Sequence, residues 1–227
     1  NSGGVYLAEA DDVTLTNVLA AAGGDVHITS GGAMTAQTVV AAVGSVTLEA
    51  TSGAMTAQSV TATGGNVSLR TMAGAMTAQS VFATSGVTLD AAGNLTVGDI
   101  TSGAGASLTA TSGGSILDDG NNGTDISAVI LTLTAAGGIG SNAAQGQIDT
   151  TAAMISATAS GGGVYLAEAN DVVLTNVNAG GNVNITSGGA MAAQSVTTTA
   201  GSITLEATSG TLTANSVSAT GGDVTLR

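Results

Sequence analysis

The chain contains no cysteine, proline, tryptophan or lysine, and its only aromatic residues are two tyrosines and one phenylalanine among 227 residues. Without cysteine there is no disulfide framework and no thiol chemistry. Aromatic side chains normally supply much of the buried area of a wide globular core, so such a core is excluded. The apolar residues that remain are small or β-branched, and they suit a narrow core between closely spaced strands.

Positive charge is almost as scarce. Fifteen acidic residues face only Arg70 and Arg227, which gives a net charge of −13. Nucleic-acid binding needs clustered Lys and Arg against the phosphates, and attraction to anionic membranes needs the same residues, so we expect neither partner. No apolar run reaches the roughly 18 residues of a membrane span, and we expect no membrane insertion.

What the chain does contain is repetition on two length scales. Residues 164–179 match residues 5–20 with three changes, and residues 182–227 follow residues 25–70. Within each long copy a shorter beat places Met34, Met55 and Met76 at intervals of 21 residues. A period near 20 with glycine-rich punctuation indicates one small unit stacked many times. We therefore predict a single continuous β-solenoid segment over residues 1–227, with a long repeat of about 157 residues.

Each coil opens with glycine or another small residue and continues with apolar and polar residues in alternation. Pairs such as Val26/Ile28 and Val46/Leu48 recur every 20 or 21 residues, with a polar residue between the two members. Alternation with period 2 predicts a strand with one buried face. Frequent glycine, together with Thr, Val and Ser, argues against helix. The fold class is therefore all-β, with coils of about 20 residues.

A second segment of each coil has the pattern MTAQ-S/T-V. Its methionine and valine are five residues apart, so strict alternation cannot bury both, and a bend near the glutamine is expected. Gln37, Gln58 and Gln79 should then stack and hydrogen-bond along the rod, as in cross-β ladders.

Coil boundaries follow from the glycine positions, and seven coils would make one long repeat. The expected coils begin near Gly23, Gly44, Gly64, Ser85, Gly103, Val129, Met154, Gly180, Gly201 and Gly221. The stretch 103–153 is less regular, and insertions in a solenoid form surface loops.

Runs such as GGDVHITSGGAMTAQ, GSVTLEATSGAMTAQSV and GGNVSLR resemble the haemagglutinin-type repeats of filamentous haemagglutinin-like adhesins and giant bacterial exoproteins. The resemblance covers nearly the whole chain and implies a right-handed parallel β-helix. It also implies a secreted or surface-held bacterial fibre used in adhesion, aggregation or biofilm formation. Nothing in these residues matches the family's secretion domain or a receptor-binding module.

The first expectation for function is therefore a structural rod at the outer cell surface or outside the cell, contacting cell-surface or matrix carbohydrate. The alternative is a self-assembling matrix filament whose subunits stack end to end. Exposed strand edges recruit further strands, so self-association at the ends is expected in either case.

Catalysis is not expected, although parallel β-helices also host polysaccharide lyases and hydrolases. Such sites need a carboxylate cluster, usually with Arg or Lys. The best acidic group is Glu9, Asp11 and Asp12, repeated in part at Glu168 and Asp171. We interpret these carboxylates as lying on the outer face of strands and turns. The only histidine, His27, becomes Asn184 in the second copy, so neither a catalytic base nor an organic cofactor is indicated.

Calcium is the one ion that the sequence suggests. A loop broken by glycine brings together five residues with oxygen ligands, the chemistry that Ca²⁺ prefers: Asp118, Asp119, Asn121, Asn122 and Asp125. Their spacing does not match an EF-hand loop. Asp, Asn and Gly also turn the chain for purely structural reasons, so the turn interpretation stays open beside the calcium one.

Ice binding is a further alternative, because some β-solenoids present flat Thr-x-Thr arrays. Thr14/Thr16 and Thr132/Thr134 have this form, but Val173 interrupts the first pair in the second copy.

Overall fold

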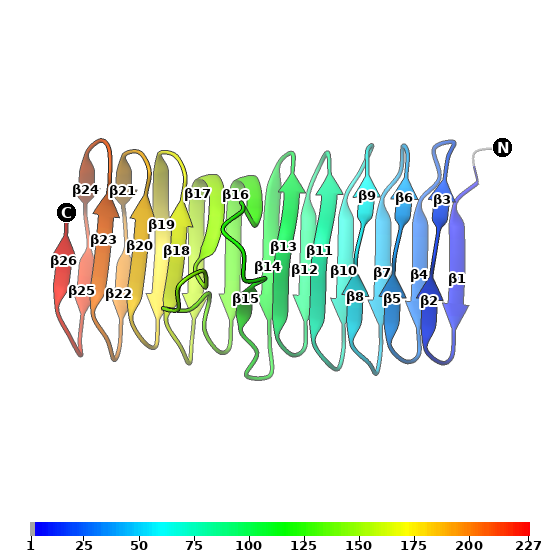
Figure 1. Ribbon diagram of the computed structural model, residues 1–227, viewed down its shortest axis with the longest axis horizontal. Helices are drawn as coiled ribbons and strands as arrows, with labels where there is room; N and C mark the ends of the chain where they lie inside the picture. Colours follow the sequence, from blue (N-terminus) through cyan, green and yellow to red (C-terminus); the bar gives the residue numbers. More distant parts are fainter. Residues whose placement is uncertain (1–2) are drawn as a thin grey trace.

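Twenty-six strands, all paired in parallel, wind around one axis as a β-solenoid of about 11 turns (Figure 1). The computed structural model describes residues 3–227, so residues 1 and 2 of the expected solenoid lie outside the described residues. The described residues form no helix, hence none that could cross a membrane. The all-β solenoid with coils of roughly 21 residues confirms the predicted fold class.

The strands form two ladders, one on each side of a flattened cross-section, and Figure 1 shows their arrows pointing in opposite directions. The first ladder contains β1 (Val5–Glu9), β4 (Val26–Ser30), β7 (Val46–Ala50), β10 (Val67–Thr71), β12 (Val87–Ala91), β14 (Gly105–Ala110), the later parts of β16 (Ile126–Ala135) and β17 (Ile148–Ala159), β19 (Val172–Ala179), β21 (Met191–Ala193), β22 (Val196–Thr198), β24 (Leu212–Ala214) and β25 (Val217–Ala219).

The second ladder contains β2 (Val13–Leu15), β3 (Val18–Ala20), β5 (Met34–Ala36), β6 (Val39–Ala41), β8 (Met55–Ala57), β9 (Val60–Ala62), β11 (Met76–Ala83), β13 (Leu95–Ser102), β15 (Ile116–Asp118), the first parts of β16 and β17, β18 (Val164–Glu168), β20 (Val183–Ser187), β23 (Ile203–Ala207) and β26 (Val224–Leu226).

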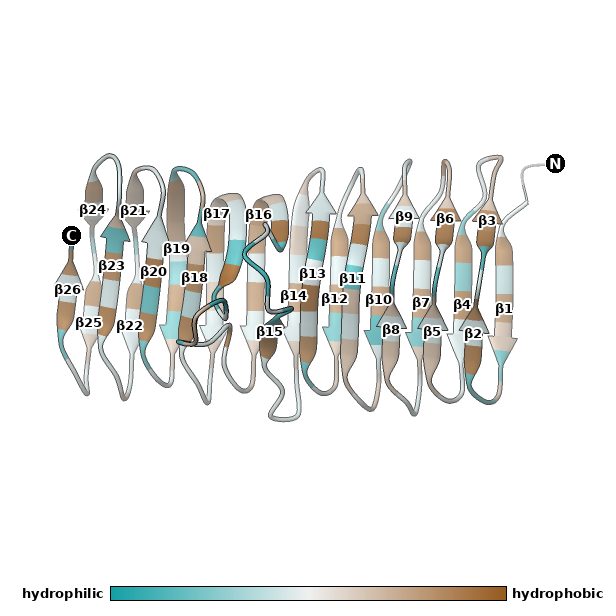
Figure 2. Cartoon of the chain, viewed as in Figure 1, coloured by the Kyte–Doolittle hydropathy of each residue, from teal (hydrophilic) through white to brown (hydrophobic). Residues whose placement is uncertain are grey.

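The core is a narrow stack of small and branched side chains between the two ladders. In β7, Val46, Leu48 and Ala50 are buried, whereas Thr47 and Glu49 point outward. The same alternation gives the banded colouring of the strands in Figure 2. Because each coil repeats the pattern in register, identical residues meet their copies along the axis, and the core continues from coil to coil.

The bend predicted inside MTAQ-S/T-V is present. Met34 and Val39 are both buried, and the chain leaves strand geometry between β5 and β6. The predicted glutamine ladder is wrong. Gln37, Gln58 and Gln79 lie on the outside of the bend, and within residues 3–227 their side chains take part in no hydrogen bond. The bend turns the amides outward, where water replaces a stacked partner.

Polar side chains at the turns hold each coil to the next. The Asp25 carboxylate accepts a hydrogen bond from the Ser45 backbone N–H, and the Asn66 carbonyl oxygen accepts one from Gly86 N–H, both at 2.8 Å. Asn94 and Asn182 make the same contact with Ser115 and Ser202. Asp, Asn and Ser recur before the strands because these side chains satisfy donors that the ladders leave unpaired.

The two long copies are placed half a turn apart. Val5 pairs with Val26 in the first ladder, but its counterpart Val164 pairs with Ile139 and Val183 in the second. The prediction of seven coils per long repeat is therefore wrong, because the repeat spans about seven and a half. Met154 pairs with Val173, not with the region after Gly180, and this pairing supplies the missing half coil.

The stretch 103–153 contains the irregular coils. A loop over residues 119–125 leaves the rod between β15 and β16, and Figure 2 shows it as a polar segment. Gly120 turns this loop with φ of +92°, a conformation that side chains rarely adopt. The expectation that the insertion forms a surface loop is confirmed.

Candidate functional site

The most unusual side chain of the rod is Asp118, at the end of β15. In the ladder it pairs with Val97, and the inward position that it occupies is held in earlier coils by Ala36, Ala57 and Ala78. A carboxylate therefore takes a place that is otherwise apolar and buried. Asp118 Oδ2 accepts a hydrogen bond of 2.9 Å from Gly120 N–H. Asp118 Oδ1 is buried without a partner, and it is the only such side-chain oxygen or nitrogen in the described residues.

Asp125 closes the same loop and is 1% exposed. The β-ladder fixes its backbone, because Ile100 N–H donates to the Asp125 carbonyl at 2.7 Å and Asp125 N–H donates to Asp149 O at 2.8 Å. Its carboxylate oxygen Oδ2 accepts a hydrogen bond of 2.7 Å from Asp149 N–H. The loop therefore returns to the rod with its last carboxylate pressed against the coil edge.

Asp118, Asp119 and Asp125 form one acidic cluster, in which one carboxylate oxygen from each lies within 4.8 Å of the others. Of the five residues predicted as calcium ligands, the structure brings these three together. Asn121 acts one step away, because its backbone N–H and its side-chain amide both donate to Asp119 Oδ1. Asn122 is exposed, and no hydrogen bond joins its side chain to this cluster.

The electrostatics of the cluster are unfavourable for three ionised carboxylates. Burial raises the pKa of Asp125 to about 8, with the hydrogen bond from Asp149 N–H opposing and the carboxylates of Asp118, Asp149 and Asp119 adding to the rise. Burial and the Asp118 charge also raise the pKa of Asp149. Sequence reasoning missed Asp149, because its place beside Asp125 depends on the pairing of β16 with β17 across the irregular coils.

Both arginines of the chain are engaged elsewhere. Arg70 Nε lies 3.5 Å from Asp90 Oδ2 on the first ladder, and Arg227 Nε donates to Glu206 Oε2 at 3.0 Å. Since the chain has no lysine, the acidic cluster has no cationic side chain as a partner.

Glu168 corrects another expectation. It was interpreted as a carboxylate on the outer face, but it points inward at the end of β18 and is 3% exposed. Oε2 accepts hydrogen bonds of 2.8 Å from Thr150 Oγ1 and from Ala152 N–H, and Oε1 accepts one of 3.1 Å from Asn170 N–H. Burial raises the pKa of the Glu168 carboxyl, and these hydrogen bonds oppose the rise.

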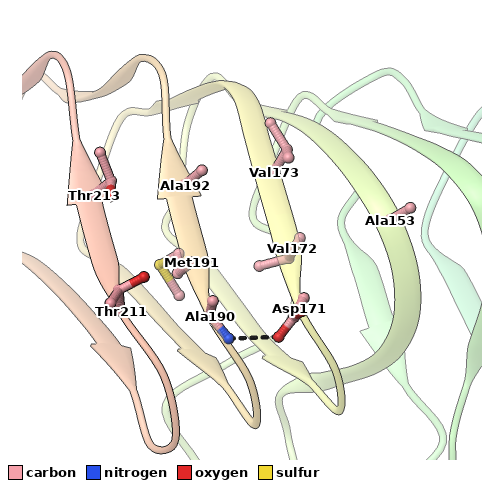
Figure 3. Close-up of a pocket in the computed structure, with 9 residues that line it drawn as sticks. All are labelled: Ala153, Asp171, Val172, Val173, Ala190, Met191, Ala192, Thr211 and Thr213. Carbon is pink, nitrogen blue, oxygen red and sulfur yellow. Dashed lines mark hydrogen bonds between the residues drawn. The ribbon is translucent and has the colours of Figure 1, made fainter.

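The remaining acidic candidates serve the turns. Asp12 Oδ1 accepts a 2.7 Å hydrogen bond from Ala33 N–H, and its copy Asp171 makes the same 2.7 Å contact with Ala190 N–H. Figure 3 shows Asp171 at the edge of a shallow groove of about 320 Å³ across β19, β21 and β24. The other residues that line the groove are small or apolar, with two threonines, so it brings a single carboxylate to the surface.

The polar columns of the outer face are mixed. His27 stands between Tyr6 and Thr47 in the first ladder. Thr132/Thr134 is followed along the ladder by Ser156/Thr158 and preceded by Ser107/Thr109, so the Thr-x-Thr form is kept in one coil only. A longer column runs along the second ladder, through Thr14, Thr35, Thr56, Thr77 and Thr96.

The fold defines this chain as a β-solenoid repeat protein with coils of roughly 21 residues. No protein-family model, curated protein or solved structure matches it.

Proposed function

We propose that this chain is a structural rod segment of a secreted or cell-surface bacterial fibre, acting in adhesion, aggregation or biofilm formation. The observation that carries the proposal is the unbroken pairing of coils: parallel strands join each coil to its neighbours along both ladders. At a rise of about 4.8 Å per coil, about 11 coils span roughly 50 Å. The resemblance of its runs to haemagglutinin-type repeats supports the same function.

The outer columns supply the contacts. Threonine, asparagine and aspartate repeat along both ladders at the spacing of the coils, and hydroxyl, amide and carboxylate groups hydrogen-bond to carbohydrate. Each such contact is weak, but many in a row act together and give avidity. Cell-surface or matrix carbohydrate is therefore the partner that we propose.

Surface labelling of the source cells tests the proposed location. An antibody against the recombinant 227-residue chain should label intact cells or the surrounding matrix, and protease treatment of intact cells should remove the signal. Labelling only after permeabilisation would overturn the proposal. Adsorbing the protein to beads and measuring their retention on polysaccharide-coated surfaces tests the adhesive part.

The alternative is a filament whose subunits stack end to end. One observation favours it: the core positions Leu7 in β1 and Leu226 in β26 are 42% and 44% exposed, because no coil covers them in the described structure. A further coil of the same chain would cover them equally well. Filaments with a uniform subunit boundary in electron micrographs of native material would favour stacking.

A polysaccharide-acting enzyme is the competing class. The rod proposal expects no release of reducing or unsaturated ends from acidic or neutral polysaccharides. Turnover that is lost in the variants Asp12→Asn and Asp171→Asn would assign catalysis to these two acidic turns.

A further inference from the structure

We propose that Asp118, Asp119 and Asp125 bind one calcium ion, which fastens the loop over residues 119–125 to the rod. This site does not depend on the proposed function, because its argument uses only the local geometry and charge.

The first support is the place of Asp118 in the ladder. Its position is filled by alanine or valine in four preceding coils, where the side chain packs in the core. At the fifth, a carboxylate points into the same column and leaves Oδ1 buried with no hydrogen-bond partner. An unpaired buried carboxylate oxygen is costly, and a metal ion is the kind of partner that removes this cost.

The second support is the charge balance. Three carboxylates converge within 4.8 Å, and one of them, Asp125, is almost fully buried. Both arginines are paired with other carboxylates, and lysine is absent from the chain. Like charges at this spacing repel, so the ionised cluster needs a cation from solution.

The third support is size. Oxygen ligands on opposite sides of one ion are separated by twice the metal–oxygen distance, about 4.8 Å for Ca²⁺ at about 2.4 Å and about 4.1 Å for Mg²⁺. The upper limit of 4.8 Å among the three oxygens fits the larger ion without movement of the backbone. Calcium also accepts irregular sites completed by water and backbone carbonyls, whereas Mg²⁺ demands octahedral geometry.

Thermal unfolding of the full 227-residue chain tests the site, with CaCl₂ or MgCl₂ as the only added ligand after treatment with EDTA. The Tm is expected to rise by several degrees with calcium and to keep rising with the logarithm of its concentration, with a smaller response to magnesium. Isothermal titration should give one ion per chain. No shift up to 10 mM calcium, or an equal response to magnesium, would overturn the proposal.

Two variants separate binding from folding. Asp118→Ala restores the residue found in earlier coils, so it should abolish the calcium response and yet raise the Tm measured in EDTA. Asp119→Asn keeps size and folding but should weaken calcium binding at least tenfold. The exposed Asp223→Asn serves as a matched control and should respond to calcium like the parent chain. A calcium response unchanged in Asp118→Ala would place the ion elsewhere and reject this site.

Discussion

Val13 and Val164 lie in one ladder, connected through the residue pairs of seven intervening coils, although they belong to different motifs of the repeat. The sequence counterpart of Val164 is Val5, which lies in the opposite ladder. The solenoid tolerates this exchange because both motifs place small apolar residues inward. Backbone pairing between coils does not depend on which motif is above or below.

Cysteine crosslinking tests the exchange directly, in a chain with no cysteine of its own. Thr158 pairs with Asn178, whereas a repeat of seven whole coils would place Thr158 against Thr186. Neighbouring strands are about 4.8 Å apart, within the Cα separations of disulfides. Oxidation should crosslink Thr158→Cys with Asn178→Cys, and gel mobility after proteolysis would report it. Efficient crosslinking of Thr158→Cys with Thr186→Cys instead would contradict the register.

Val60→Asp should destabilise the rod by about 3–5 kcal/mol, because it places an unpaired charge in the core. Val60 is fully buried in β9. Chemical denaturation followed by circular dichroism would measure the loss. The neighbouring Thr61→Asp, on the outward side of the same strand, should change the free energy of unfolding by less than about 1 kcal/mol. Equal effects of the two substitutions would mean that inside and outside are wrongly assigned.

Glu168 gives the rod a pH dependence of known sign. Its pKa is raised in the folded state, so its contribution to stability is fully present below its ordinary value of 4.5 and is lost as pH rises through the raised pKa. The Tm of Glu168→Gln relative to the parent chain should therefore increase from pH 4.5 to pH 8. Its counterpart Glu9 is exposed, and Glu9→Gln should show a flat difference over the same range. A flat difference for Glu168→Gln would show that the buried carboxylate carries no such linkage.

The recombinant 227-residue protein should associate end to end. The edges of β1 and β26 have unpaired backbone groups, and exposed strand edges recruit others. Multi-angle light scattering should show linear species whose mass grows with concentration, and polar capping coils added at both ends should restore the monomer. A compact monomer over a hundredfold range of concentration would contradict this expectation.

Local pattern predicted most of the fold. The alternation around Val46 and Leu48 places side chains inward or outward within a single strand, and the bend between Met34 and Val39 follows from their spacing. The half-turn offset was also present in the sequence, since Val164 follows Val5 by 159 residues, about seven and a half coils of roughly 21. The irregular stretch concealed it, because coil boundaries there were placed from glycines, not from pairing.

The candidate site was only partly predictable. The composition of the loop indicated Asp118, Asp119 and Asp125, but composition cannot tell which carboxylates converge. Asp149 joins them through pairing between distant segments, and Glu168 is buried by the same pairing. These contacts depend on which coil lies above which, a relation that alternation within one coil does not determine.

The half-turn offset makes the rod two-sided. Ligands attached to the same motif in the two long copies would face away from each other, separated along the axis by about 36 Å for seven and a half coils at about 4.8 Å each. A rod whose copies were in phase would hold all its ligands on one flank, like the teeth of a comb. This one can grip a surface with one copy and a second surface, on the far side, with the other.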